Sequence, residues 1–321
     1  MERRKFGKTD MEISILGFGG AEIGFHQTSQ ATVAELLDRA LDAGLNVIDT
    51  AECYVNSEEL IGEAVASRRK DYYLFTKCGH PQGFGQPDDW TMAGVTNCIE
   101  QSLKRLQTDY LDLVQLHSCT AEVLRQGEAI EALQRAREAG KTRYIGYSGD
   151  STDAVCAIES GAFDTLQTSV SIADQESLTL LLPLAIQNNM GVIAKRPIAN
   201  AAWRYQEAPE VAYHLPYWQR LKQLNYDFVA DGGQAADTAL RFTLYTAGVH
   251  TAIVGTTRPD RWQHNADVLA QGALPAEVYA SIRKRWYAVA DTNWVGQVEQ
   301  QTWGNRCAYL KPVIKVEIVV V

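Results

Sequence analysis

Short apolar runs alternate with amphipathic segments along most of the chain. The runs have the length of strands and occur near residues 15–19, 45–49, 72–77, 111–116, 142–147, 164–168, 191–195 and 250–254. Apolar residues at i, i+3 and i+4 spacing predict helices between them, the first at Val33, Leu36, Leu37, Ala40 and Leu41 and the others near 57–69, 91–106, 122–139, 152–160, 175–189, 235–247 and 259–270. Strands joined by helical crossovers run parallel, so eight of them predict an α/β fold, a closed (β/α)8 TIM-type barrel.

An open, doubly wound sheet is the alternative fold for this alternation. Its first strand would lead through a G-x-G-x-x-G turn directly into a helix. Here the first strand leads into Gly17-Phe18-Gly19-Gly20 and then into a long loop. The pattern therefore favours the barrel.

Three segments fall outside the repeat of strand and helix. Turn residues at Gly7-Lys8-Thr9-Asp10 predict an N-terminal β-hairpin at about 4–14. Residues 198–234 are too long for a simple loop, and we expect a lid or an extra helix over the site there. The tail at about 286–321 is expected to add an extra C-terminal helix or tail, and its last residues, 313–321, alternate like a strand without an identifiable partner. We expect residues 1–321 to form a single barrel domain.

The charge balance narrows the possible partners. The chain has 39 acidic and 30 basic residues, a formal net charge of −9. Nucleic acids and anionic membranes bind basic surfaces, so we expect neither as a partner. No apolar run approaches the ~18 residues of a membrane span, and no signal sequence follows the charged start. With six scattered cysteines, these features predict a cytoplasmic protein with reduced thiols.

Three of the apolar runs end on titratable side chains. Asp49 ends the second run and Tyr54 follows at the start of a helix, while Lys77 ends the third run and His117 the fourth. Barrel enzymes keep their chemistry at the carboxyl ends of the strands, so these four side chains should converge on one rim. Lys77 would lower the pKa of Tyr54 and Asp49 would orient Lys77, while His117 would position a carbonyl or share the proton. Bracing or packing explains each residue alone, but four at successive strand ends predict a site that protonates an oxygen.

The end of the eighth run has the features of a phosphate site. Gly255 and Thr256 lie in a turn that leads into a helix, with Arg258 and Arg261 next to the helix N-terminus. Backbone N–H groups at a helix N-terminus bind phosphate, and barrels of this kind use the loops after strands seven and eight for it. The alternative is that a threonine only caps the helix and that the arginines are solvated.

Four segments together resemble the aldo-keto reductases: Asp49-Thr50-Ala51-Glu52-Cys53-Tyr54, Asn56-Ser57-Glu58-Glu59-Leu60-Ile61-Gly62, Thr76-Lys77 and Gln115-Leu116-His117. The resemblance covers about residues 3–290. It implies an NAD(P)H-dependent reductase that acts on a small-molecule aldehyde or ketone. In the implied catalytic tetrad, Tyr54 is the general acid, Lys77 and Asp49 tune it, and His117 orients the carbonyl. The resemblance also implies which residues bind the cofactor: Ser148 and Gln167 at the nicotinamide carboxamide, and Gly255, Thr256, Arg258, Arg261 and Asn265 at the adenosine end.

The chain departs from the family pattern at three positions. Gly149 stands where members usually have Asn, so one carboxamide hydrogen bond would be missing. Lys195 and Arg196 follow the seventh strand where many members place an aromatic residue, which suggests another support for the ring or a cation near the pyrophosphate. His264 replaces a Glu near the adenine.

The basic residues at the start of the last barrel helix also bear on the choice of cofactor. Arg258 and Arg261 could bind a 2′-phosphate through charge-assisted hydrogen bonds, although Asp260 is close. We therefore expect NADP as the cofactor, with NADPH preferred over NADH.

Two other classes of function remain open at this point. One is a cofactor-binding regulatory or redox-sensing barrel subunit with little turnover, which the intact tetrad disfavours. The other is a metal hydrolase, because several possible ligands occur near the same rim: Cys53, Cys78, His80, His117 and Cys119. No H-x-x-x-H or C-x-x-C spacing supports a metal site, so we expect none.

Overall fold

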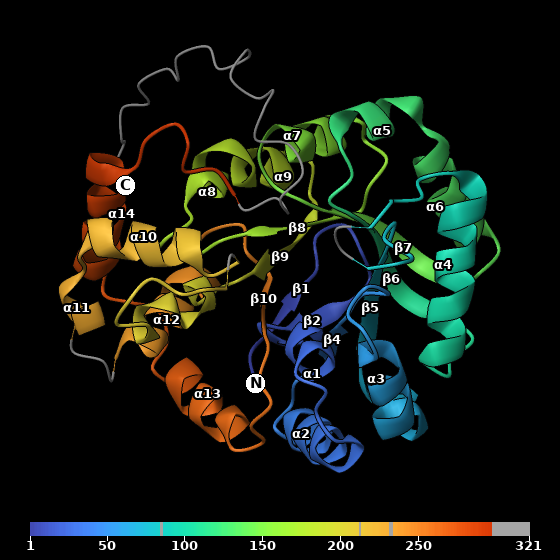
Figure 1. Cartoon of the computed structure of the whole chain (residues 1–321), viewed down its shortest axis with the longest axis horizontal. Coiled ribbons are helices and arrows are strands. Elements are labelled where there is room, and N and C mark those ends of the chain that lie inside the picture. The colour runs from blue at the N-terminus through green and yellow to red at the C-terminus, as the bar shows by residue number, and fades with distance from the viewer. Residues whose placement is uncertain (84–85, 212, 231–233, 297–321) are drawn as a thin grey trace.

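A computed structural model of the chain describes residues 1–83, 86–211, 213–230 and 234–296. Eight parallel strands close into a barrel in the order β10-β3-β4-β5-β6-β7-β8-β9 (Figure 1). The barrel strands are β3 (Leu16–Gly19), β4 (Val47–Asp49), β5 (Tyr73–Cys78), β6 (Leu111–His117), β7 (Thr142–Ser148), β8 (Thr165–Ser169), β9 (Gly191–Lys195) and β10 (Thr251–Val254). The predicted (β/α)8 fold is confirmed, and an open sheet is excluded because β10 pairs with both β3 and β9.

The strands are apolar because both of their faces are buried. On β6, Val114 and Leu116 pack in the large cluster that includes the surrounding helices, whereas Leu113 packs in a small cluster inside the barrel. Side chains alternate along a strand, so Gln115 and His117 point to the same side as Leu113. The alternation that fills the barrel therefore also directs polar side chains into its C-terminal mouth.

Helices surround the barrel and mostly follow the predicted ranges. They are α1 (Ala21–Phe25), α2 (Gln30–Asp42), α3 (Ser57–Val65), the 3-10 helix η1 (Ala66–Asp71), α4 (Met92–Arg105), α5 (Ala121–Gln126), α6 (Glu128–Glu138), α7 (Ser151–Glu159), α8 (Glu176–Leu180), α9 (Leu182–Gln187), α12 (Ala235–Leu244), α13 (Arg261–Ala270) and α14 (Ala276–Val289).

The helix expected at 57–69 is divided into α3 and the 3-10 helix η1, and two further predicted helices are also divided. The helix expected at 122–139 breaks into α5 and α6 at Gly127, whose φ of 80° lies in the left-handed region. The helix expected at 175–189 is divided into α8 and α9, and Pro183 lies in the first turn of α9, where its missing N–H costs nothing. Both breaks are local backbone events that leave the apolar periodicity intact, so the periodicity did not reveal them.

The predicted hairpin closes the N-terminal end of the barrel. It consists of β1 (Arg3–Lys5) and β2 (Glu12–Ser14), which pair antiparallel. Phe6, Met11 and Ile13 from this segment are fully buried against interior residues of the barrel, and Phe6 stacks on Phe75 with 5.9 Å between ring centroids. The hairpin is therefore a hydrophobic plug at the end of the barrel opposite the strand tips.

Additional elements follow β9 and β10. The segment expected to form a lid or an extra helix contains η2 (Ala199–Arg204), α10 (Leu215–Leu224) and α11 (Asp227–Ala230). These elements pack with α12 and α14 in a second hydrophobic cluster, and Figure 1 shows α10, α11 and α14 on the same side of the barrel. The strand-like segment 313–321 lies outside the described residues. No helix within the described ranges is both long and apolar enough to cross a membrane.

Candidate active site

Asp49 and Lys77 form a buried ion pair at the mouth of the barrel. They lie at the C-terminal ends of adjacent strands, Asp49 as the last residue of β4 and Lys77 as the penultimate residue of β5, and each side chain is only 1% exposed. The Lys77 ammonium donates to Asp49 Oδ1 and to the carbonyl oxygen of Thr50, the latter at 2.7 Å. The two residues that the sequence paired are thus in direct contact.

The other carboxylate oxygen of Asp49, Oδ2, accepts hydrogen bonds from side-chain amide groups. Gln167 Nε2 donates to Oδ2 at 2.9 Å, and Gln115 Nε2 approaches the same atom at 3.4 Å. Ser148 Oγ in turn donates to Gln167 Oε1 at 3.0 Å, so Ser148 and Gln167, the two residues expected at a carboxamide, are linked to Asp49. Burial raises the pKa of Asp49, and the hydrogen bonds and the attraction of Lys77 offset this only in part.

Tyr54 lies beside the ion pair. The Lys77 ammonium is 5.2 Å from the centroid of the Tyr54 ring, and the ring meets His117 edge to face at 5.8 Å. The loop that carries Tyr54 packs closely against α1. A Cβ on Gly24 of that helix would lie only 2.0 Å from the Tyr54 carbonyl oxygen. The four expected residues therefore come together on one rim, although they come from different strands and loops.

His117 is a buried, neutral imidazole. Burial lowers its pKa well below the usual range, and the electrostatic effects of Lys77, His80, Lys195 and Arg196 lower it further. A neutral imidazole at the mouth can donate one hydrogen bond to a carbonyl oxygen without adding a charge to the site.

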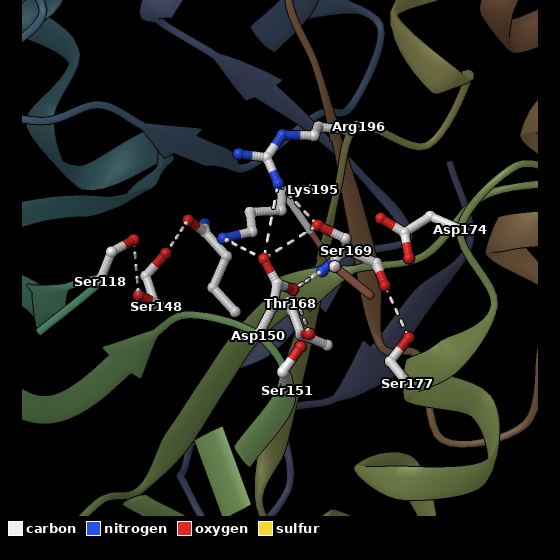
Figure 2. Close-up of polar contacts among 12 residues, drawn as sticks. Ser118, Ser148, Asp150, Ser151, Thr168, Ser169, Asp174, Ser177, Lys195 and Arg196 are labelled. Atoms are coloured by element: carbon white, nitrogen blue, oxygen red, sulfur yellow. Dashed lines mark hydrogen bonds and ion pairs between the residues drawn. The ribbon is translucent and has the colours of Figure 1, made fainter. Parts of the chain in front are cut away.

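A second charged cluster lies next to these residues, at the ends of β7 to β9. Figure 2 shows Lys195 and Arg196 converging on Asp150, with distances of 3.1 Å and 3.5 Å to its Oδ2 atom. The backbone N–H of Ser169 and the hydroxyl of Thr168 donate to its other oxygen. Burial acts to raise the pKa of Asp150, but Lys195, Arg196 and these hydrogen bonds outweigh it and bring the pKa below its usual value. Lys195 and Arg196 thus place two cations beside the single carboxylate of Asp150.

The loop after β10 carries the residues expected at the adenosine end. Thr256 Oγ1 accepts a hydrogen bond from the backbone N–H of Arg258, and α13 begins at Arg261. The exposed side chain of Arg258 pairs with Asp260 at 2.8 Å. Asn265 is only 8% exposed, and its Nδ2 atom has no hydrogen-bond partner among the described residues. A buried amide without a hydrogen-bond partner, close to a helix N-terminus that carries arginines, is suited to binding a polar, anionic ligand. The phosphorylated adenosine of a dinucleotide is such a ligand.

The structure explains why residue 149 is glycine. A Cβ at this position would lie 2.5–2.7 Å from the ring and hydroxyl of Tyr147. Tyr147 is buried and donates to the Cys119 carbonyl oxygen at 2.7 Å, so the ring is fixed. The usual asparagine is therefore excluded by packing against Tyr147.

Sequence reasoning missed some contacts of the mouth. Asp150 was not recognised, although it lies only two residues after the end of β7. Cys53 lies 3.5 Å from His117 Nδ1, and His80 bonds to the His117 carbonyl oxygen, whereas the sequence indicates both only as possible metal ligands. In the part of the chain that the structure describes, no three His, Cys, Asp or Glu side chains are arranged to hold a metal ion.

The chain matches a known family over most of its length. A sequence model described as the Aldo/keto reductase family matches residues 15–286. The chain belongs to the aldo/keto reductase family. The family consists of oxidoreductases that use a nicotinamide cofactor, and the mouth of this barrel has polar and cationic groups suited to one.

Individual known proteins resemble the chain in sequence and in structure. An uncharacterized oxidoreductase, YqkF of Bacillus subtilis, is 28% identical over 286 residues, which cover 83% of this chain and 90% of that protein. The L-galactose dehydrogenase of Arabidopsis thaliana is 29% identical over 290 residues, or 84% of this chain and 89% of that enzyme. Among solved structures, the holo form of the aldo-keto reductase AKR11C1 from Bacillus halodurans has a TM-score of 0.78 at 28% identity, and the match covers 92% of this chain and 99% of that one.

Proposed function

We propose that the protein is an NADPH-dependent reductase of aldehydes and ketones in which Tyr54 is the general acid. The observation that carries this proposal is the position of the Lys77 ammonium, which is bonded to Asp49 and faces the Tyr54 ring at 5.2 Å. A cation beside a phenol favours loss of the phenolic proton. The reduced nicotinamide, when bound, supplies the hydride that adds to the carbonyl carbon.

The chain's own residues then complete the reduction. His117 donates a hydrogen bond to the substrate oxygen and orients the carbonyl toward Tyr54. Tyr54 delivers its proton to that oxygen as negative charge develops on it, and the Lys77 ammonium stabilises the phenolate that remains. In the reverse direction the same phenolate removes the proton of an alcohol.

The cofactor is proposed to lie across the mouth from β7 to β10. Ser148 and Gln167 bind the carboxamide, Lys195 and Arg196 attract the pyrophosphate, and Arg261 with Asn265 bind the adenosine end. The two cations beside Asp150 and the buried Asn265 amide, which has no hydrogen-bond partner among the described residues, support this path. We further propose a cytoplasmic location, where NADPH is available.

The decisive experiment is a panel of aldehydes and ketones assayed with NADPH and with NADH at the nicotinamide absorbance. Tyr54→Phe should lower kcat by about 10²- to 10⁴-fold, because it removes only the proton donor, while the melting temperature and NADPH affinity change little. Tyr287→Phe is the matched control, since it removes a phenol that is 58% exposed on α14. A Tyr54→Phe protein that reduces a good substrate at near wild-type rate would refute the mechanism.

A further inference from the structure

The catalytic histidine of the proposed mechanism is held by side chains that the tetrad does not include. Cys53 Sγ lies 3.5 Å from His117 Nδ1. His80 Nε2 lies 2.6 Å from the His117 carbonyl oxygen, and His80 Nδ1 lies 2.6 Å from Asp88 Oδ1. All three of Cys53, His80 and His117 are at most 7% exposed, so these contacts are shielded from water.

The contacts of His80 determine where its protons are. A carbonyl oxygen only accepts hydrogen bonds, so His80 Nε2 must carry a proton and donate it to His117. The second ring nitrogen, Nδ1, lies 2.6 Å from Asp88 Oδ1, within hydrogen-bond distance of that carboxylate. The backbone N–H of His80 donates to the buried Glu52 at 2.6 Å, which fixes the main chain from which the ring projects. The His80 ring is therefore clamped between Asp88 and the main chain of His117.

The contact of Cys53 bears on the His117 ring itself. A neutral imidazole has one protonated and one bare nitrogen, and the partner of one nitrogen decides the state of the other. A thiol hydrogen is a weak donor and an imidazole nitrogen is a good acceptor, whereas thiol sulfur is a weak acceptor. The favoured arrangement is thus S–H donating to Nδ1, which leaves the imidazole proton on Nε2.

We propose that Cys53 and His80 are positioning residues for His117, with Cys53 fixing the tautomer that carries its proton on Nε2 and His80 fixing its main chain at the end of β6. The consequence for turnover rests on the proposed reductase function. In that reaction the Nε2–H group of His117 orients the carbonyl. Cys53, which precedes Tyr54 in the chain, supports this step by fixing the tautomer of His117. The tautomer itself is a property of the ligand-free protein and is measured without turnover.

The tautomer is measured on the full chain with ¹⁵N-labelled histidine. Long-range ¹H–¹⁵N spectra above the pKa of His117 separate a protonated from a bare ring nitrogen, and a His117→Gln sample assigns the signals. Wild type should show protonated Nε2 and bare Nδ1. In Cys53→Ala the two nitrogen shifts should move toward each other as both tautomers become populated, and Cys53→Ser, which keeps a donor, should restore the wild-type pattern. Cys156→Ala, at a half-buried thiol on α7, is the control and should leave both shifts unchanged.

Turnover tests the consequence. Cys53→Ala and His80→Ala should each lower kcat about tenfold, with cofactor affinity within about twofold of wild type. Cys53→Ser should recover most of the lost rate. His80→Gln should do so as well, because its amide can still donate to the His117 carbonyl oxygen. Recovery by these conservative variants would not follow if the two side chains only filled space.

The outcomes separate this proposal from the proposed function. A wild-type His117 with its proton on Nδ1 would overturn the assignment of the tautomer, whether or not the protein reduces carbonyls. Unchanged shifts and unchanged kcat in Cys53→Ala would remove Cys53 from the role, and unchanged kcat in His80→Ala would remove His80. A protein that turns over no carbonyl compound but shows the expected shifts would refute the reductase and leave the tautomer assignment intact.

Discussion

At the scale of single residues, Asp49 and Lys77 hold opposite charges in a site with almost no water. An isolated buried charge is expensive, and a pair repays that cost only when its geometry is good and its remaining hydrogen-bonding atoms are satisfied. Here Asp49 receives hydrogen bonds on both oxygens, and Lys77 has a second acceptor in the Thr50 carbonyl. The pair is therefore both a structural unit and the source of the positive charge beside Tyr54.

Replacing Lys77 tests both roles. Lys77→Met should lower kcat at least about 100-fold and should destabilise the fold by about 3–5 kcal/mol, because Asp49 would keep a buried charge without a counter-ion. Urea unfolding and single-turnover kinetics measure the two effects. Lys77→Met combined with Asp49→Asn should regain much of the stability but none of the rate. A double variant that regains rate as well would show that the ammonium is dispensable for catalysis.

Asp174 predicts a pH dependence of stability. Burial raises its pKa to about 7, and Arg220, 3.8 Å away, offsets this only in part. Since the folded pKa lies above the reference value of 3.8, the folded state binds more protons between these values, and the contribution of Asp174 to stability falls as pH rises from about 4 to about 7. Asp174→Asn should remove this loss. The free energy of unfolding of the variant relative to wild type should therefore rise by about 1–3 kcal/mol across that range. A difference that stays constant from pH 4 to 8 would contradict the raised pKa.

At the scale of elements, the strands were predictable because buried parallel strands are continuous apolar runs, and polar residues that interrupt them at the C-terminal end stand out. Asp49, Lys77 and His117 could be found this way. The helix break at Gly127 and the short α1 could not, because neither changes the spacing of apolar residues over a window long enough to detect. The contacts of Asp150 with Lys195 and Arg196 depend on how β7 and β9 flank β8, and sequence pattern does not contain that register.

The N-terminus of α13 gives a prediction about cofactor choice. Arg258 is paired with Asp260, whose pKa the hydrogen bonds from Arg258 lower. A 2′-phosphate would have to share Arg258 with that carboxylate. Arg261→Ala should weaken NADPH binding at least about tenfold more than NADH binding, and Asp260→Asn should strengthen NADPH binding about two- to fivefold by freeing Arg258. Fluorescence titration of both cofactors measures this, and equal losses for NADPH and NADH in Arg261→Ala would move the phosphate contact elsewhere.

At the scale of the whole molecule, the two ends of the barrel differ in the side chains they bury. The C-terminal mouth contains buried carboxylates whose charge costs stability, including Asp49 and Asp174, whose pKa values are raised by burial. The N-terminal end is closed by the apolar hairpin, where Phe6 packs on Phe75 and a Cβ at Gly191 would lie 2.6 Å from the Phe6 ring. In barrels of this class the C-terminal end carries the function and the N-terminal end contributes stability. The close packing of the hairpin therefore offsets the free energy that the buried charges of the mouth cost.

That separation predicts opposite phenotypes at the two ends. Phe6→Ala should lower the free energy of unfolding by about 3–5 kcal/mol, because it leaves a cavity among fully buried side chains. At a temperature where the variant stays folded, its kcat and NADPH affinity should remain within about twofold of wild type, since Phe6 packs in the hydrophobic cluster of the hairpin and barrel interior, at the end opposite the strand tips. Tyr54→Phe should show the reverse, with the rate lost and stability kept. Urea melts and steady-state kinetics on the same preparations compare the two variants directly. A large fall in kcat for folded Phe6→Ala would mean that the plug transmits its packing through the barrel interior to the catalytic rim, and that the two ends are not independent.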